Sequence, residues 1–349
     1  MSSEKDKTTV NVARAIDELI LVPLSNWPMI LGHPIKKLYE HAQEKVQTRK
    51  PLSLLAAEKL KEIIKPKDNV IITTGFIVPP YFVGETDGPP GAAALARALN
   101  VGLKATPVIV TEEVLTRMMS ATCQSAGLLG YNLEEASACS GRFAIKSFPT
   151  DSEEGKKTAN KMLDEIKPSA IISIERPGRN EKGVYHSGRG LDISSVTSKV
   201  DFLMDEARSR GLLTIGIGDL GNEVGMGSIK SAIERLAPDL AVCKCPCKGS
   251  RITVTETEIL LPATISNWGG YGIEASLALV LQEPRVLHDE TTEELMLRAS
   301  AQGGAIDSGS GLAIPAVDGA SEDINKIIVR LLRSLIEGGL KALRAQEKK

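Results

Sequence analysis

Acidic side chains in two glycine-rich loops are the residues of this sequence best suited to chemistry. Glu85 and Asp87 lie in GETDGPPG, directly before the helical pattern AAALARAL. Asp219 and Glu223 lie in GIGDLGNEVGMG, which continues the apolar run LLTI. Carboxyl groups can act as general acids and bases or hold a cation. Backbone amides at a helix start favour an anion, but these carboxylates oppose one. The loops therefore predict a site for a cation, an ammonium group or a ligand carrying both signs.

Two guanidinium groups and two amide side chains accompany the carboxylates. Arg176 and Arg179 follow the apolar run SAIISI, and an arginine can bind a substrate carboxylate through two hydrogen bonds. Asn222 lies in the second acidic loop, and Asn267 precedes a helical pattern. For Asn267, an ordinary capping role at the helix start and a contact with ligand are both open. A small amino acid with more than one carboxylate would satisfy this mixture of charges.

The same loops suggest two further ligand classes. Glu85, Asp87 and Asp219 could hold a hydrated divalent cation, Mg²⁺ or Mn²⁺, because hard cations prefer oxygen ligands. GIGDLG also has the glycine spacing of a dinucleotide-binding loop. Asp219 would occupy the place of the pyrophosphate, however, and this loop belongs to the fifth strand-like run rather than the first. The sequence therefore favours a cation or an amino acid over a nucleotide.

A cysteine cluster offers a different metal chemistry. In an extended strand, the spacing of Cys243, Cys245 and Cys247 would place three thiols on one face, which suits a soft metal. The single residues between them, one of which is proline, depart from the usual two-residue spacing of a zinc knuckle. The sequence therefore favours small buried or edge-strand side chains. His186, in VYHSG, could shuttle protons, but a lone histidine in a loop is expected at the surface.

The elements that must position these loops alternate between strand and helix from Asn69 onward. Five apolar runs with helical patterns between them predict parallel strands joined by right-handed crossovers. The fold class is therefore α/β, a Rossmann-like doubly wound, mostly parallel sheet with helices on both faces. Ligands bind at the carboxyl ends of such strands. The later stretch CKCPCKGSRITVTETEILLPATI alternates apolar and polar residues and predicts an antiparallel hairpin or an edge extension of the sheet.

The chain has no long linker and no internal repeat. Residues 1–66 contain several amphipathic helical patterns and are expected to form a helical N-terminal segment that packs as a cap on the main domain. Residues 67–349 are expected to form the Rossmann-like domain. The terminal run DINKIIVRLLRSLIEGGLKALRAQ predicts a long amphipathic helix.

Composition excludes several classes of protein. A formal net charge of −2 and an aromatic content of 3% provide neither the basic field nor the stacking surface typical of nucleic-acid binding. No apolar run approaches the roughly 18 residues of a membrane span, and the first residues lack the apolar segment of a signal peptide. We therefore expect a cytoplasmic protein with a small-molecule substrate and no nucleic-acid or membrane partner. Assembly as a homo-oligomer is left open.

Five motifs resemble one known family. GETDGPPGAAALARAL, ERPGRNEKGVYHSGRGLDIS, TIGIGDLGNEVGMG, SNWGGYGIEASLAL and AVDG, in that order along residues 69–320, are similar to the C-terminal domain of the D-glutamate cyclase family. The resemblance implies a Rossmann-like fold and a lyase that converts D-glutamate to 5-oxo-D-proline with loss of water. The family's motif is commonly GDGGNE. This sequence has Leu220 in place of one of its glycines but keeps the polar residues around that position.

Two functions from different classes remain open. As an enzyme, the chain would use Glu85 or Asp87 as the base, Arg176 as the clamp for a carboxylate, and Asp219 or Glu223 as the acid or as a ligand of a divalent cation. No ATP is required for closure of a five-membered lactam, because intramolecular attack has a large effective concentration. As a non-catalytic or regulatory module, the same sheet edge would bind an amino acid or related carboxylate, with or without a metal ion.

Overall fold

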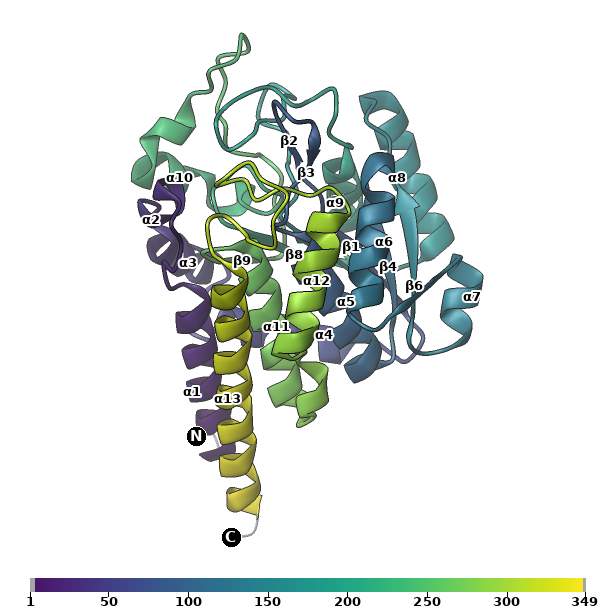
Figure 1. The fold of residues 1–349 in the computed structure, drawn as a ribbon, viewed down its shortest axis with the longest axis vertical. Helices are drawn as coiled ribbons and strands as arrows, with labels where there is room; N and C mark the ends of the chain where they lie inside the picture. The colour runs from purple at the N-terminus through teal and green to yellow at the C-terminus, as the bar shows by residue number, and fades with distance from the viewer. Residues whose placement is uncertain (1–3, 348–349) are drawn as a thin grey trace.

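A parallel sheet with helices on both faces organises the computed structural model, which describes residues 4–347 (Figure 1). The seven strands of the sheet are β1 (Asn69–Thr73), β4 (Thr106–Thr111), β5 (Leu129–Tyr131), β6 (Arg142–Ser147), β7 (Ala170–Ile174), β8 (Leu213–Gly218) and β9 (Ile259–Pro262). A separate antiparallel hairpin consists of β2 (Ile77–Val78) and β3 (Val83–Gly84).

Thirteen α-helices connect and cover these strands within the described part of the chain. They are α1 (Glu4–Ile20), α2 (Pro28–Leu31), α3 (Ile35–Lys45), α4 (Leu52–Ile63), α5 (Pro89–Leu103), α6 (Thr116–Ser125), α7 (Leu133–Ala138), α8 (Ser152–Ile166), α9 (Val200–Ser209), α10 (Lys230–Leu236), α11 (Ser266–Leu281), α12 (Glu290–Gln302) and α13 (Glu322–Glu347). Short 3₁₀ turns are η1 (Glu113–Leu115), η2 (Gly227–Ile229), η3 (Pro238–Ala241) and η4 (Pro284–Val286).

The strand order places a crevice in the middle of the sheet. The order is β5-β6-β4-β1-β7-β8-β9, and each neighbouring pair is parallel. From β1 the chain builds one half of the sheet, then crosses to the other half at β7. Adjacent loops at such a switch point leave in opposite directions and open a ligand crevice at the carboxyl ends of the strands. The predicted Rossmann-like doubly wound fold is confirmed.

Alternate strand residues serve two separate hydrophobic cores. Ile72 and Ile172 face one side, where they join a large cluster with α5 and α11. Ile71 and Ile171 face the other side, where they join a cluster with α8 and α9. This alternation follows from the two-residue period of a strand and explains the continuous apolar runs of the sequence.

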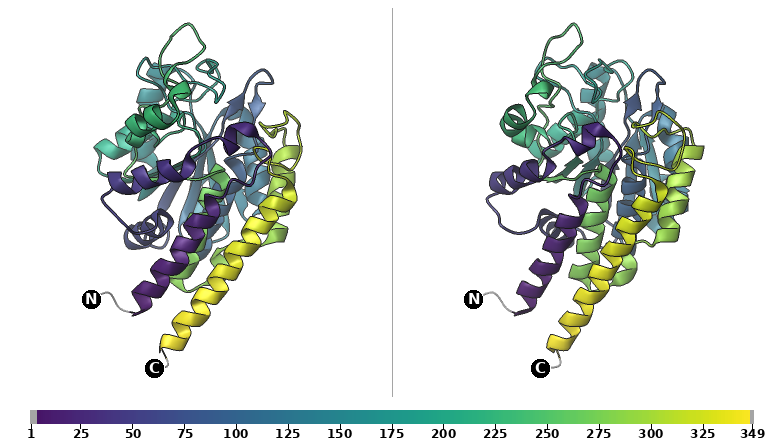
Figure 2. Two further views of the ribbon diagram at one scale, coloured as in Figure 1. Left: turned by 90° about the vertical axis from the view of Figure 1, so that its left-hand side faces the viewer. Right: turned by 60° about the vertical axis from the view of Figure 1, so that its left-hand side comes forward.

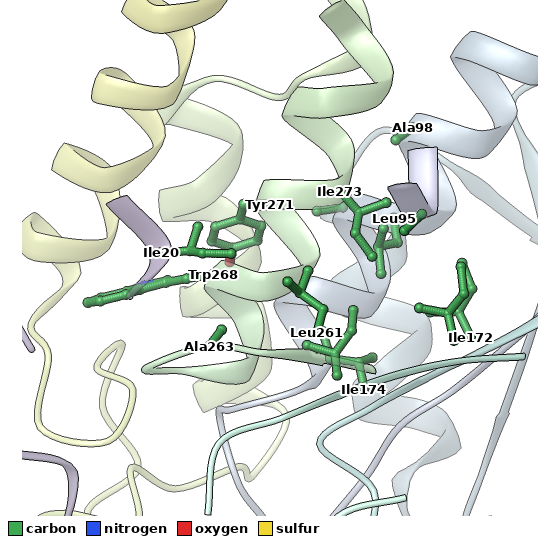
Figure 3. Close-up of a cluster of buried hydrophobic side chains, with 14 of the residues drawn as sticks. Ile20, Leu95, Ala98, Ile172, Ile174, Leu261, Ala263, Trp268, Tyr271 and Ile273 are labelled. Carbon is green, nitrogen blue, oxygen red and sulfur yellow. The ribbon is translucent and has the colours of Figure 1, made fainter. Parts of the chain in front are cut away.

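Helix α11 lies at the centre of the larger core. Figure 3 shows Trp268, Tyr271 and Ile273 of this helix among side chains from the strands and from α5. Trp268 is fully buried, and its indole Nε1 donates a hydrogen bond of 2.8 Å to Asn325 Oδ1 at the start of α13. The helix that opens with SNWGG is buried from Ser266 to Leu279, which explains its mostly apolar sequence.

The helices of the N-terminal segment share this core. Helix α1 runs beside α13, as both views in Figure 2 show. Ile16 and Ile20 of α1 belong to the same buried cluster as the strand residues above. The division of the chain into a cap of residues 1–66 and a domain of residues 67–349 remains a prediction.

Of the two alternatives predicted for residues 243–265, the edge extension of the sheet is confirmed and the antiparallel hairpin is wrong. Residues 243–258 form no hairpin, and β9 pairs in parallel with β8 at one edge of the sheet. The alternating pattern before β9 comes from threonine and serine residues whose side chains bond backbone groups of an irregular segment, such as Thr253 Oγ1 donating to Arg179 O. The short strand β5, at the other edge, was not predicted.

Among the described residues, no helix is both long enough and apolar enough to cross a membrane.

A buried charged group fixes α12 against α11. His288 Nδ1 lies 2.6 Å from Glu274 Oε2, and its Nε2 lies 3.2 Å from Glu293 Oε2. Tyr271 Oη donates to the Glu293 carboxylate at 2.8 Å, and Arg97 Nη1 lies 3.9 Å from Glu274 Oε1. Burial alone would lower the pKa of His288, but the charge of Glu274 and the hydrogen bonds to both carboxylates raise this pKa to about 9.

This group predicts a stability loss at alkaline pH. The pKa of His288 is higher in the folded state than its ordinary value of 6.5. The contribution of His288 to the free energy of unfolding is therefore fully present below pH 6.5 and is lost as pH rises through about 9. We expect wild type to lose on the order of 1–3 kcal/mol of unfolding free energy between pH 6.5 and 9.5. His288→Gln should lack this component in urea titrations at both pH values. An equal pH dependence in both proteins would contradict the assignment.

Candidate functional site

A small cavity lies at the switch point predicted by the strand order. Its volume is about 50 Å³, enough for several water-sized groups. Loops after β1, β7 and β8 supply its acidic residues, and the late loop 303–321 closes one side (Figure 1). The lining residues include five carboxylates, which are Glu85, Glu175, Asp219, Glu223 and Asp318. An apolar wall completes the cavity, contributed by Trp27, Phe76, Val78, Pro79, Leu191 and Leu220.

Burial and mutual repulsion raise the pKa values of these carboxyl groups. For Asp219 burial acts first and the charge of Glu223 second, and both hold its pKa well above the ordinary range. The same causes raise the pKa of Glu175 well above its usual range, with Asp219 the strongest neighbouring charge. Burial raises the pKa of Glu223 to about 7, although backbone amides such as Gly221 N–H oppose the shift. The cluster is therefore suited to proton transfer or to binding a positive group.

Two oxygens of this cluster have no hydrogen-bond partner. Asp219 Oδ1 and Glu223 Oε1 are buried and unpaired within the part of the chain described here. Glu85 instead accepts from Ser308 Oγ, and Glu175 Oε2 accepts from Ser266 Oγ at 2.5 Å. Buried carboxylate oxygens without partners are costly, so these two mark where a ligand cation or ammonium group would be stabilised.

The backbone at Glu175 adds a second sign of a functional site. Glu175 has φ of 42°, the left-handed region that residues with a side chain seldom adopt. This conformation turns the chain at the end of β7 and brings the carboxylate over the crevice. Asp87, Glu175 and Asp219 each offer one oxygen within 4.8 Å of the others. Such an oxygen set suits a hard divalent cation, and it includes two of the three residues predicted to bind one, whereas Glu85 stands apart from this set.

Asp87 and Asn267 cap each other's helices. Asp87 Oδ1 accepts from Asn267 N at 2.8 Å, and its Oδ2 accepts from Ser266 N at 2.8 Å, so this carboxylate caps α11. In return, Asn267 Oδ1 accepts from Gly88 N at 2.9 Å and from Gly91 N at 2.8 Å at the start of α5. Proline occupies positions 89 and 90 and offers no amide hydrogen, which makes Gly91 the first free donor of that helix.

The close approach of these helix starts requires a glycine. A Cβ atom at position 91 would lie 2.5 Å from Ile174 Cδ1 and 2.9 Å from the Cα of Asn267. Asn267 therefore does have a capping role, but at the start of α5 and not at the start of its own helix as predicted. Asp87 is also absent from the cavity lining within residues 4–347, since it lies beneath the cavity with all three neighbouring amides bound.

These contacts predict that Asp87→Asn destabilises the protein. One Asp87 oxygen becomes an NH₂ group, which would face the N–H of Ser266 or of Asn267 and leave it without an acceptor. We expect the free energy of unfolding in urea to fall by about 1–3 kcal/mol. Glu85→Gln is the matched control, because Glu85 caps no helix, and its change should stay below about 1 kcal/mol. Equal stability of both variants and wild type would show that the capping bonds contribute little.

The two arginines expected to bind substrate have other partners. Arg176 is fully buried, and its Nη1 and Nη2 donate to the two carboxylate oxygens of Glu112 at 2.5 Å each. Arg179 pairs with Asp201 at 2.6 Å and with Asp205 at 2.5 Å. Neither appears among the described residues that line the cavity. These contacts favour a structural ion pair at Arg176 over the predicted clamp, and only its Nε is left without a partner among the described residues.

Asn222 does reach the cavity, together with residues that sequence reasoning left out. Asn222 lines the cavity and donates through Nδ2 to His186 O at 2.9 Å, so its Oδ1 is free for a ligand. Arg189 lies exposed at the cavity mouth and is the cation placed to meet a substrate carboxylate. Arg189 lies in the short motif SGRG, and Asp318 lies in AVDG. Both motifs can be seen in the sequence, but no neighbouring residue indicates that they lie near the acidic loops.

The cysteine run and His186 also differ from expectation. Residues 243–247 form a turn rather than a strand, and Cys243 and Cys245 are buried. His186 is buried as well, with Nε2 at 3.2 Å from Cys245 Sγ, so the expectation of a surface histidine is wrong. The tight turn around Pro246 folds the thiols together, whereas a strand would have spaced them along one face.

Comparison with solved structures adds nothing to this description. A dehydrogenase/reductase from Sinorhizobium meliloti 1021 is 13% identical, with a TM-score of 0.26, covering 80% of this chain and 91% of the other. The ureidoglycine-glyoxylate aminotransferase from Bacillus subtilis is 12% identical, with a TM-score of 0.23, covering 95% and 90%. Scores this low assign neither a fold nor a function.

Sequence comparison is more informative. The mitochondrial D-glutamate cyclase of Homo sapiens is 28% identical over 280 residues, which is 77% of this chain and 41% of that protein. The chain thus spans about two fifths of the length of this curated relative. A family model described as D-glutamate cyclase-like, C-terminal, matches residues 29–333. Because that match covers most of the chain, including every loop that supplies an acidic residue to the cavity, the chain belongs to the D-glutamate cyclase-like, C-terminal family.

Proposed function

We propose that this protein is a lyase that cyclises D-glutamate to 5-oxo-D-proline with loss of water. The observation that carries the proposal is the buried carboxyl cluster with two unpartnered oxygens, Asp219 Oδ1 and Glu223 Oε1, at the switch point of the sheet. Family membership supports the choice of substrate. A cluster of acidic groups in a pocket attracts an ammonium group, and Arg189 at the mouth supplies the opposite charge for a carboxylate.

The reaction needs one base and one acid. A carboxylate takes a proton from the substrate ammonium, and the neutral amine then attacks the carbon of the side-chain carboxyl group to form the C–N bond. The attacking nitrogen then gives up a second proton, the carboxyl groups pass both protons to the departing oxygen, the C–O bond breaks, and water leaves. Glu223 suits one of these roles because its pKa of about 7 allows both protonation states near neutral pH, and Asp219 suits the other because burial and the charge of Glu223 raise its pKa. Because the amine and the carboxyl group belong to one molecule, ring closure already has a high effective concentration, and the site has only to hold the reactive conformation.

Each remaining group has a supporting role in this scheme. Asn222 and Ser187 line the cavity and can donate or accept hydrogen bonds to the substrate. Glu85 and Glu175 add negative charge that favours the ammonium form on binding. Asp87 supports the site indirectly, because it accepts a hydrogen bond from the start of α11. Asn267 accepts one from the start of α5. The oxygens of Asp87, Glu175 and Asp219 would also fit Mg²⁺ or Mn²⁺, which would offset their mutual repulsion.

An assay of the purified chain tests the proposal. The protein is incubated with D-glutamate, and 5-oxoproline is followed by chromatography in the presence of EDTA, Mg²⁺ or Mn²⁺. L-glutamate measures selectivity, and a sample without protein measures spontaneous cyclisation. We expect product above the spontaneous rate with D-glutamate. Absence of product under all three metal conditions would overturn the proposal for the isolated chain.

A binding module is the second candidate. The observation that favours it is the extent of the match, because 59% of the curated relative lies outside the region that this chain covers, given that 41% is covered. The acidic cavity would then hold an amino acid without converting it. Calorimetry with D-glutamate and 5-oxo-D-proline separates the two candidates: saturable heat without product favours the module, whereas product formation favours the lyase.

A further inference from the structure

Four side chains outside the carboxyl cluster converge on one point. Cys243, Cys245 and Cys247 come from the turn between η3 and β9, and His186 comes from the loop between β7 and α9. Each offers one ligand atom, and the four atoms all lie within 4.8 Å of one another. Side chains separated by about sixty positions in sequence thus meet as a soft donor set of three sulfurs and one nitrogen.

The separations fit a single tetrahedral ion. Cys243 Sγ lies 3.3 Å from Cys245 Sγ and 3.4 Å from Cys247 Sγ. His186 Nε2 lies 3.2 Å from Cys245 Sγ and 3.6 Å from Cys247 Sγ. Zinc bonds of about 2.3 Å to sulfur and 2.0 Å to nitrogen give tetrahedral edges of roughly 3.8 and 3.6 Å. These four separations are equal to the expected edges or shorter by at most about 0.5 Å, so a small outward movement of the side chains would make room for the ion.

Other chemistries match the cluster less well. A disulfide needs sulfur atoms about 2.05 Å apart, well below the separations here. An iron–sulfur cluster spreads its cysteine ligands over several iron atoms and requires wider spacing than three thiols in direct contact. Mg²⁺ and Mn²⁺ prefer oxygen ligands, which this cluster lacks. Zinc is the common ion that combines thiolate and imidazole ligands in a closed four-ligand site.

Surrounding groups support thiolates at this position. Gly249 N donates to Cys247 Sγ at 3.3 Å, and Asn180 Nδ2 approaches the same sulfur at 3.8 Å. Lys182 Nζ donates to Cys247 O at 2.7 Å and brings a positive charge to the turn. His186 is 1% exposed, and its Nε2 points into the sulfur cluster. Amide donors and nearby cations stabilise the negative charge that three thiolates leave on a zinc site.

We propose that His186, Cys243, Cys245 and Cys247 bind one Zn²⁺ in a structural site. Four protein ligands leave no open position for substrate, which distinguishes it from a catalytic zinc centre. The ion would join the turn at residues 243–247 to the loop at residues 186–190. That loop is a wall of the acidic cavity, since Ser187, Gly188 and Arg189 line it and His186 O accepts from Asn222. The zinc would therefore fix the cavity wall without entering the cavity.

Metal content tests the proposal independently of any enzymatic activity. The full chain is purified under reducing conditions from zinc-supplemented medium, and its metals are measured by mass spectrometry. We expect about one zinc per chain in wild type and in Cys139→Ser, whose thiol is exposed and outside the cluster. Cys245→Ser should hold at least tenfold less zinc after dialysis. His186→Cys, which keeps four soft ligands, should retain it.

A spectroscopic measurement on wild type tests the proposal even if the variants fail to fold. Co²⁺ added to the metal-free protein should produce the visible bands and the thiolate charge-transfer absorption of tetrahedral coordination, and Zn²⁺ should abolish them. Zinc below one tenth of an equivalent in reduced wild type, an octahedral Co²⁺ spectrum, or equal zinc in Cys245→Ser would each overturn the proposal. A Cys243–Cys245 disulfide in protein purified without oxygen would do the same.

Discussion

Asp219→Asn is expected to lower the turnover of D-glutamate at least about 100-fold, because a general acid or base typically contributes 10²–10⁴-fold. Asn has nearly the shape of Asp but can neither take nor give the required proton. Asp219 Oδ1 has no partner among residues 4–347, and repulsion from Glu223 adds to the effect of burial on its pKa. The rate of 5-oxoproline formation at saturating D-glutamate is the measurement.

The same change should leave the protein as stable as wild type or more stable. Replacing a buried carboxyl among like charges by a neutral amide removes repulsion, which is the usual trade between stability and function at an active site. Asp164→Asn on the surface of α8 is the matched control and should change neither turnover nor melting temperature appreciably, since its carboxylate is exposed and pairs with Arg210 at the surface. Full activity of Asp219→Asn would remove Asp219 from the proposed mechanism.

The second large effect concerns the ion pair between Glu112 and Arg176. Glu112→Gln is expected to lower the free energy of unfolding by about 3–5 kcal/mol, because it leaves a buried guanidinium without a counter-charge. Both guanidinium nitrogens that contact Glu112 are fully buried, and they also donate to Gly75 O at 2.6 Å and Ser198 O at 2.8 Å. Arg176 thus ties together the ends of β1, β4 and β7. Urea unfolding of both proteins measures the difference.

A double variant separates this structural role from substrate binding. Glu112→Leu combined with Arg176→Met replaces two charges by apolar groups of similar size and should recover much of the stability lost in Glu112→Gln. Substrate affinity of that double variant is then informative. If Arg176 contacts the substrate, the KM for D-glutamate should rise strongly even where stability is restored. If Arg176 is structural, as its contacts indicate, the KM should stay near that of wild type.

Arg189 shows why a positive charge for a substrate carboxylate could be predicted more easily than the residue that provides this charge. Both expected arginines directly follow β7, where the chain passes into the crevice, so the sequence favoured them. Arg176 turns into the protein because Glu112, at the end of β4, approaches it from the other side of β1. The loop that follows then reaches back over the cavity and places Arg189 at the mouth. The order of strands in the sheet brings Glu112 to Arg176, whereas Arg189 is exposed and donates only a long hydrogen bond of 3.4 Å to Ser308 O among the described residues.

The sequence by itself determined the fold class and the identity of the acidic loops. Strand and helix patterns are local properties, set by which face of each element is apolar, so alternating runs predicted a parallel sheet. Parallel strands end at one edge, which is why Glu85, Asp219 and Glu223 could be expected together. The family motifs in these loops could likewise be recognised without coordinates.

Tertiary structure alone decided the partners of each polar group. Asp87 and Asn267 are 180 positions apart and cap each other's helices only because α5 and α11 start side by side. His186 meets the cysteines because two irregular loops fold toward each other, and no periodic pattern encodes that path. Burial is likewise a property of the assembled molecule, and it raises the pKa values of the carboxyl cluster. Short-range preferences fix elements, whereas contacts between distant loops depend on how those elements pack.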